Sequence, residues 1–292
     1  MKKLLLLFIL LATLYIQTSA QIEITSRSTD KGVVFDAYLE EYGTHTLVLK
    51  FTELEGYINA MRNLKVVIES GRNNSIYRLE NDAGASTRFR YIYTYYRGKY
   101  NSKPDIDYPY LFPAATGKTL GIARFEHINT KLGKADADSI LGIVFNYEGA
   151  DTVCAIRSGQ VVKIDHSEKE RDDSRGFVYY DKLSQNVVTI EHADGSIARY
   201  ICITAANILP KEGERIIAGQ PIAVFVKEEE RNRMGLHLYH LDKDLKNQVI
   251  KAQFYTAEGF IQPDFGKRYE SVSTKEIIEK ELSKKEKKKL NL

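Results

Sequence analysis

The residues of this chain with the clearest potential for chemistry lie in the stretch MGLHLYH, residues 234–240. Side chains alternate between the two faces of a strand, so we expect His237 and Tyr239 on one face and His240 on the other. Imidazole nitrogens bind divalent metals, but a zinc site on the first face would need histidines at both 237 and 239. The stretch is a metal site, the remains of one, or a coincidence. The elements that surround it in the sequence decide among these three interpretations.

The first 20 residues have the pattern of a secretory signal peptide. Lys2 and Lys3 precede an apolar stretch from Leu4 to Tyr15, and the small residue Ala20 ends the segment. We therefore expect cleavage near Ala20 and a mature chain that is periplasmic or secreted. No later apolar run is long enough to span a bilayer, so no transmembrane segment is expected.

Charge and cysteine content exclude some functions. The net charge is +3, and from Thr274 onward seven lysines oppose four glutamates, so the basic excess lies in this tail. A nucleic-acid binder normally needs a concentrated basic face, and we expect no nucleic-acid partner. Cys154 and Cys202 are too few for a disulfide scaffold. They form either one bridge or two small, buried, apolar side chains.

Strand-like alternation dominates the chain and predicts an all-β fold. In residues 21–103, Leu47, Leu49 and Phe51 share one face, and turn residues separate several such runs, which indicates a β-sandwich domain. The tyrosines of STRFRYIYTYYRG are expected to pack between its layers. Residues 104–118 hold three of the six prolines and predict an extended linker that docks on the next domain.

The second predicted domain, an antiparallel β-barrel or sheet, spans residues 119–270. Its strand candidates are bounded by turns that contain glycine, and they are DTVCAIRSGQVVKI, NVVTIEHADGSIARYICI and RIIAGQPIAVFV. Residues 271–292 have apolar side chains at helical spacing among lysines and glutamates. They predict a short, charged helical tail that frays into a basic end.

Three segments of this domain are similar, in order, to the motifs of one family. DTVCAIRSGQVVKI resembles G-T-P-V-x-A-x-x-x-G-x-V, and MGLHLYH resembles G-P-H-L-H-F. Between them, NVVTIEHADGSIARYICI and LPKEGERIIAGQPIAVF resemble an H-x-x-G turn, a Y-x-H-L strand and V-x-x-G-x-x-V-x-x-G-Q-x-I. This order is that of the lysostaphin-type (LytM) zinc metallopeptidases, which cut the peptide cross-links of peptidoglycan. The flanking parts resemble secreted members from Bacteroidetes-type bacteria.

The resemblance implies a zinc held by a histidine, an aspartate and the second histidine of H-x-H. In this chain the aspartate position is Val144, the last ligand position is Tyr239, and the histidine of Y-x-H-L is Cys202. The first histidine belongs in LGKADADS, which contains none. Only His237 agrees with the family, where it is catalytic and not a ligand. His192 matches a turn histidine that is expected to be structural.

These replacements imply a degenerate LytM-like domain without catalytic residues, metal or cofactor. Such a domain would bind peptidoglycan or a cell-wall protein, or regulate a cell-wall hydrolase, with Tyr200, His237 and Tyr239 on the floor of its groove. The alternative is an active zinc endopeptidase whose ligands are rearranged to Asp138, Cys202 and His237. Because three family ligands are missing, the sequence favours the non-catalytic interpretation.

Two other functions stay open. KEGERIIAGQPIAVF also resembles a biotinyl or lipoyl carrier motif, but a carrier needs a lysine at an exposed hairpin tip, and no such hairpin is evident. The second of these functions is that of a structural adaptor, which would bind its partner through the N-terminal β-sandwich. The sequence does not distinguish this function from the peptidoglycan-binding hypothesis.

Overall fold

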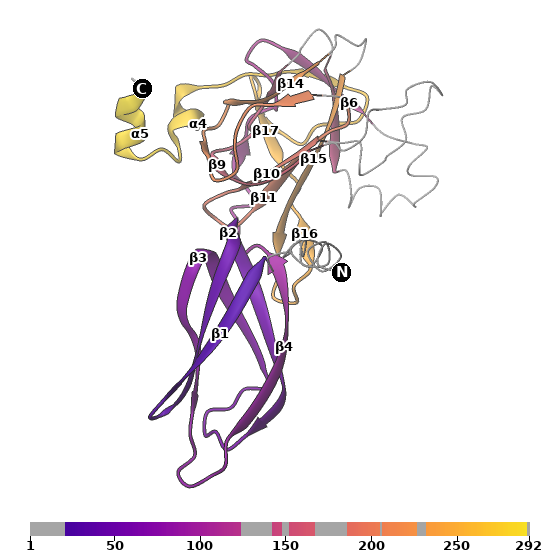
Figure 1. Cartoon of the computed structure of the whole chain (residues 1–292). Coiled ribbons are helices and arrows are strands. Elements are labelled where there is room, and N and C mark those ends of the chain that lie inside the picture. The colour runs from indigo at the N-terminus through magenta and orange to yellow at the C-terminus, as the bar shows by residue number, and fades with distance from the viewer. Residues whose placement is uncertain are drawn as a thin grey trace, which may run out of the picture.

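The computed structural model describes residues 21–123, 142–147, 152–166, 186–204, 206–226 and 232–290. In this part of the chain nearly all regular structure is antiparallel strand, and two short helices lie near the C-terminal end (Figure 1). The all-β fold expected from the alternating sequence is therefore confirmed. None of the helices described is long and apolar enough to cross a membrane.

The N-terminal sheet has four strands, and its pairings all involve the longest of them, β2. A register shift between Leu39 and Thr44 divides β2 into two parts. The first part pairs with β1, the second with β4, and β3 pairs with both. The strands are β1 (Ile22–Thr29), β2 (Gly32–Glu55), β3 (Asn63–Glu80) and β4 (Arg88–Arg97).

The core of the N-terminal domain lies between the two halves of this one sheet. Leu47, Leu49 and Phe51 point inward, as their alternation predicts. Phe35, from the first part of β2, meets the ring of Tyr91 on β4 edge-on, with 5.6 Å between the centroids. Aromatic pairs in this arrangement stabilise a core beyond the area they bury. Tyr91 therefore serves packing, whereas Tyr93 and Tyr95 are each 37% exposed, which corrects the expectation that these tyrosines all pack between the layers. The sandwich is a single sheet folded over itself.

The second domain is built around a nine-stranded sheet with the order β13-β9-β10-β11-β15-β7-β6-β19, in which β16 also pairs with β15. Every pairing in it is antiparallel. The strands are β6 (Thr119–Ala123), β7 (Ile143–Tyr147), β9 (Gly159–Asp165), β10 (Asn186–Glu191), β11 (Ile197–Cys202), β13 (Arg215–Ile216), β15 (Asn232–Leu241), β16 (Asn247–Val249) and β19 (Arg268–Glu270). The stretch MGLHLYH lies in β15, at the middle of this sheet.

Two three-stranded sheets share one hydrophobic core with the large sheet. The first is β12 (Ala206–Ile208), β14 (Pro221–Phe225) and β8 (Thr152–Cys154). The second is β18 (Gly259–Ile261), β17 (Gln253–Thr256) and β5 (Pro109–Tyr110). Tyr108, Tyr110 and Phe112 are buried in the same core, so the proline-containing segment between the domains packs on the second domain.

The C-terminal residues form two capped helices, and this corrects the prediction of one helix that frays. Thr274 caps the first helix, and Ser283 and Glu286 form a capping box at the start of the second. Ile277 is buried against Leu111. The caps stabilise the ends of the helices, and the apolar contact packs the tail on the domain. The helices are α4 (Lys275–Glu279) and α5 (Lys284–Lys289).

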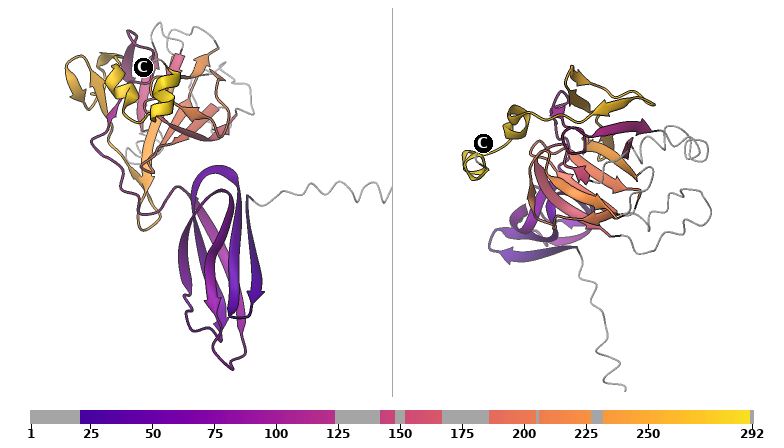
Figure 2. Two further views of the ribbon diagram at one scale, coloured as in Figure 1. Left: turned by 90° about the vertical axis from the view of Figure 1, so that its left-hand side faces the viewer. Right: turned by 90° about the horizontal axis from the view of Figure 1, so that it is seen from above.

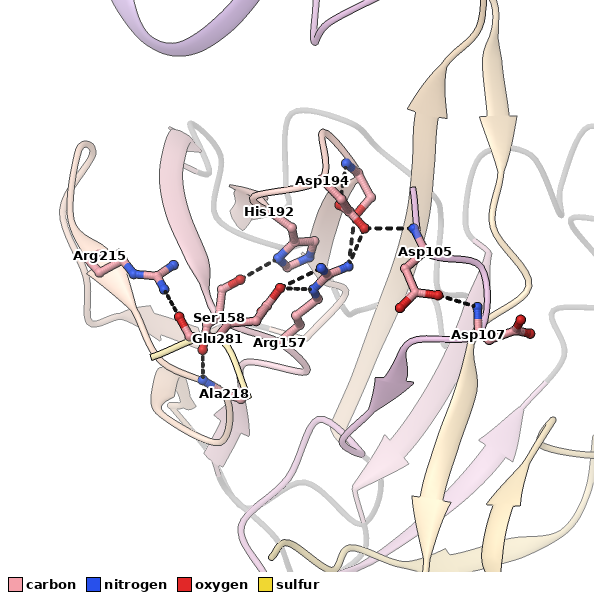
Figure 3. Close-up of polar contacts among 10 residues, drawn as sticks. Asp105, Asp107, Arg157, Ser158, His192, Asp194, Arg215, Ala218 and Glu281 are labelled. Carbon is pink, nitrogen blue, oxygen red and sulfur yellow. Dashed lines mark hydrogen bonds and ion pairs between the residues drawn. The ribbon is translucent and has the colours of Figure 1, made fainter. Parts of the chain in front are cut away.

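A buried arginine joins the linker, a turn and the tail (Figure 3). The guanidinium of Arg157 lies 2.7 Å from the Asp194 carboxylate and 2.5 Å from that of Glu281, and it covers the ring of Tyr108. Asp194 also accepts a hydrogen bond from the backbone N–H of Asp105. Burial alone would lower the pKa of Arg157, but the two carboxylates reverse this and raise it. The network therefore fixes three segments that are distant in sequence.

The two domains meet through a second set of charged groups. The Glu41 carboxylate on β2 accepts hydrogen bonds from Lys163 of β9 at 2.9 Å and from Arg97 of β4 at 2.7 Å. The backbone N–H of Thr44 donates to the carboxylate of Glu191 at 2.7 Å. Figures 1 and 2 show the N-terminal sheet as an elongated body that meets the second domain at one end.

Candidate functional site

Strands β11 and β15 present two chemically different faces. Directly paired residues of antiparallel strands point to the same face, and successive residues point to opposite faces. One face belongs to the hydrophobic core and carries Ala198, Tyr200, Cys202, Met234, Leu236 and Leu238. The opposite face, which we call the site face, carries Val144, Thr189, Arg199, Gly235, His237 and Tyr239.

His237 and Tyr239 lie together on the site face, as strand alternation predicts. Their rings are stacked, with 4.9 Å between the centroids and an interplanar angle of 26°. His240 points the other way, and its Nδ1 lies 3.4 Å from the hydroxyl of Ser102. His237 and Tyr239 can therefore act on one ligand, and His240 belongs to a different surface.

His237 is a neutral, desolvated imidazole. Only 6% of its surface is exposed, and both ring nitrogens are buried without a hydrogen-bonding partner. Burial, with a smaller contribution from the positive charge of Arg199, lowers the pKa of His237 to about 4. At neutral pH one ring nitrogen is therefore an unused donor and the other an unused acceptor.

Arg199 is a candidate site residue that the sequence analysis did not single out. It pairs directly with His237 across the β11–β15 ladder and with Thr189 on β10. Its side chain is partly exposed, and its charge acts on both His237 and Tyr239. Burial raises the pKa of the Tyr239 phenol, so this side chain is an uncharged O–H group. The alternation of IARYIC predicts that Arg199 points away from Ala198 and Tyr200. It does not predict that Arg199 lies beside His237, which follows from the register of β11 and β15.

Val144, at the position of the family aspartate, lies on the site face and is buried. It pairs with Gly235 on β15, two residues before His237. Close packing holds β7 here, because a Cβ on Gly142 would lie 2.1 Å from the carbonyl oxygen of Leu236. The position that would supply a carboxylate in the family thus offers an apolar side chain.

Tyr200 and Cys202 lie on the core face, so the structure does not bring them together with His237. Tyr200 is fully buried, and its hydroxyl accepts a hydrogen bond from the backbone N–H of Ile156 at 2.9 Å. The predicted groove floor of Tyr200, His237 and Tyr239 is therefore wrong in its first member. Cys202 is buried too, and burial raises the pKa of its thiol to about 12.

The structure also shows the state of the two cysteines and of His192. Cys154 and Cys202 are both free and buried, which is the second of the two states considered for them. His192 is buried in the turn after β10, and its Nδ1 lies 2.9 Å from the carbonyl oxygen of Ser158. Burial lowers the pKa of His192 to about 4, so this histidine is a neutral part of the turn.

The described residues do not fit a zinc centre. Among them, no three His, Cys, Asp or Glu side chains are grouped so that they could hold a metal ion. The site face offers one imidazole and one phenol, and Arg199 would repel a dication placed beside them. Asp138 and the stretch LGKADADS, residues 132–139, lie outside the described residues. Of the alternative ligand set, Cys202 and His237 point to opposite faces of the sheet.

One comparison with known proteins finds a family match within the second domain. The sequence profile of peptidase family M23 matches residues 139–248. These residues therefore carry a domain that is similar to peptidase family M23. No curated protein matches the chain.

Two solved structures are similar to it at low identity. A putative glycyl-glycine endopeptidase lytM from Ruminococcus gnavus is 12% identical, with 47% of this chain and 57% of that chain covered and a TM-score of 0.30. This chain thus spans little more than half of that protein. Csd3 from Helicobacter pylori is 13% identical, with 94% and 77% covered and a TM-score of 0.28.

Proposed function

We propose that this protein is a non-catalytic, peptidoglycan-binding member of family M23 that works outside the cytoplasm. The family acts on peptidoglycan, and residues 1–20 have the composition of a secretory signal. The proposal places binding on the site face of the M23 domain and leaves no role for hydrolysis.

The observation that carries the proposal is the set of side chains on the site face. A zinc peptidase needs three ligands that hold the metal, and the metal in turn lowers the pKa of a bound water to about 7. Val144 and Tyr239 stand at two of the ligand positions, and neither is a strong zinc donor. Arg199 adds a fixed positive charge next to His237. These residues therefore do not favour a bound metal that could polarise a scissile carbonyl.

A rearranged zinc site is disfavoured by the strand register. The alternative ligands Cys202 and His237 lie on opposite faces of the sheet, and the Cys202 thiol is kept protonated by burial. A zinc ligand must be a thiolate, so the domain would have to unpair β11 from β15 to use both residues. The non-catalytic function requires no such rearrangement.

The test uses the mature chain, residues 21–292, purified from zinc-supplemented medium and dialysed. We expect zinc far below one equivalent, sedimentation with insoluble peptidoglycan, and no release of soluble muropeptides. Absence of enrichment over an unrelated control protein would refute the binding function. One zinc per chain together with muropeptide release would refute the non-catalytic assignment, and would direct attention to Asp138.

A further inference from the structure

The site face contains three polar side chains that have no hydrogen-bonding partner among the described residues. These are the guanidinium of Arg199, the imidazole of His237 and the phenol of Tyr239, which adjacent positions on two paired strands bring together. Buried polar groups in proteins are almost always hydrogen-bonded, because an unmade bond leaves the cost of desolvation unbalanced. A ligand that supplies the missing acceptors would explain the arrangement.

Arg157 provides a comparison within the same domain. It is buried, and two carboxylates and an aromatic ring satisfy its guanidinium. Arg199 is only partly exposed, yet no carboxylate in the described part of the chain forms an ion pair with it. Glu191, an acidic residue on the same face, accepts a hydrogen bond from the backbone N–H of Thr44. The charge of Arg199 is therefore available to a ligand.

The burial of His237 without hydrogen-bonding partners is a second, independent observation. It is 94% buried, both of its ring nitrogens lack a partner, and burial keeps it neutral. A neutral imidazole presents one N–H donor, and its burial makes that donor costly to leave unused. Arg199 lies directly across the ladder from it, and Tyr239 stacks on its ring.

We propose that Arg199, His237 and Tyr239 form a binding site for a free carboxylate of a peptide. The planar guanidinium matches both oxygens of a carboxylate, and such charge-assisted pairs are strong and specific for geometry. The imidazole N–H and the phenol O–H add further donors to the same anion. The choice of a peptide carboxylate over other anions rests on the proposed function, because peptidoglycan stems end in carboxylates.

The experiment measures binding of N-acetyl-D-alanyl-D-alanine and of its C-terminal amide to residues 21–292 by titration calorimetry. We expect the acid to bind about tenfold or more tightly than the amide. Arg199→Gln should abolish this preference, and Arg199→Lys, which keeps the charge without the fork, should weaken it. The matched control is Arg90→Gln, a side chain that is 79% exposed in the N-terminal domain, and it should retain the full preference.

Three outcomes of the titrations would overturn the proposal. These are equal binding of acid and amide, an unchanged preference in Arg199→Gln, and tighter binding of inorganic phosphate than of the carboxylate. Thermal unfolding of each variant shows whether it is folded. If Arg199→Gln does not fold, the comparison of Arg199→Lys with the wild type provides the test.

Sedimentation with peptidoglycan separates this proposal from the proposed function. If the wild type does not sediment, the function fails, and the titration alone judges the carboxylate site. If wild type and Arg199→Gln sediment equally, the function stands and the carboxylate site is wrong.

Discussion

Among the described residues three histidines are buried and neutral, and each couples stability to pH. Burial is the largest cause in every case, and it lowers the pKa of His45, His192 and His237 to about 4. The unfolded chain binds a proton at each of these residues near pH 6.5, and the folded chain does so only near pH 4. The unfolded state therefore holds more protons within this window, and stability falls as the pH decreases through it.

His192 gives the clearest test of this coupling, because it lies away from the site face. Between pH 7 and pH 5 its neutral state costs the folded protein about 2 kcal/mol of stability. Over this interval the free energy of unfolding should fall by about 2 kcal/mol less in His192→Gln than in the wild type. Urea unfolding at both pH values measures this difference. Both proteins should change little between pH 7 and pH 8. An identical loss in variant and wild type from pH 7 to pH 5 would contradict the prediction.

The hydroxyl of Tyr200 is expected to matter for stability and not for binding. It accepts the backbone N–H of Ile156 inside the core, and Tyr200→Phe leaves that donor buried and unpaired. The cost should be about 1–3 kcal/mol in the free energy of unfolding. Tyr38→Phe, at a side chain that is 50% exposed, is the control and should be close to neutral. Loss of peptidoglycan binding by folded Tyr200→Phe would restore Tyr200 to the groove floor.

At the residue scale, alternation within one strand was enough to place His237 and Tyr239 together. It was not enough for Tyr200 and Cys202, because motif spacing says nothing about which face a neighbouring strand presents. The face follows from the register, in which Arg199 and not Tyr200 lies opposite His237. A shift of one residue would exchange the two faces, and the register depends on contacts far apart in sequence.

At the scale of elements, the strands were predictable and their partners were not. The alternation of β2 was visible, but it does not reveal that one strand of 24 residues pairs with three others. The helical spacing of the tail was also visible. Its docking depends on Arg157, which lies more than 100 residues earlier in a strand-rich segment and gives no local signal.

The tail is held by the ion pair between Arg157 and Glu281, and Glu281→Gln tests this. The change leaves Asp194 as the one carboxylate on a buried guanidinium, so we expect a loss of about 1–3 kcal/mol in stability. Trypsin should also cleave faster in the lysine-rich helix α5, which can be followed by mass spectrometry. Glu276→Gln, at an exposed position of α4, is the matched control. Equal cleavage rates in the two variants would show that Glu281 does not hold the tail.

At the scale of the whole molecule, a small set of polar contacts fixes the N-terminal domain on β9 and β10. Glu41 and Glu191 come from different domains, and each receives a donor from the other domain. Burial raises the pKa of Glu191, so a carboxylate at this interface depends on the Thr44 N–H and neighbouring cations for its solvation. The interface is therefore sensitive to small changes in the separation of the domains.

Gly43 and Gly71 offer a matched pair of substitutions that tests this docking. Both glycines have a φ of +85°, so alanine at either position carries the same strain of the left-handed region, about 1 kcal/mol. A Cβ at Gly43 would lie 2.5 Å from the Glu191 carboxylate and 2.5 Å from Val162, whereas a Cβ at Gly71 has nothing within 4 Å. Gly43→Ala should therefore push the domains apart. We expect a larger radius of gyration by X-ray scattering and two separate thermal transitions, while Gly71→Ala unfolds as the wild type does at a slightly lower temperature. If the two variants behave alike, the interface is not what joins the domains, and the segment from residue 98 to residue 112 must hold them.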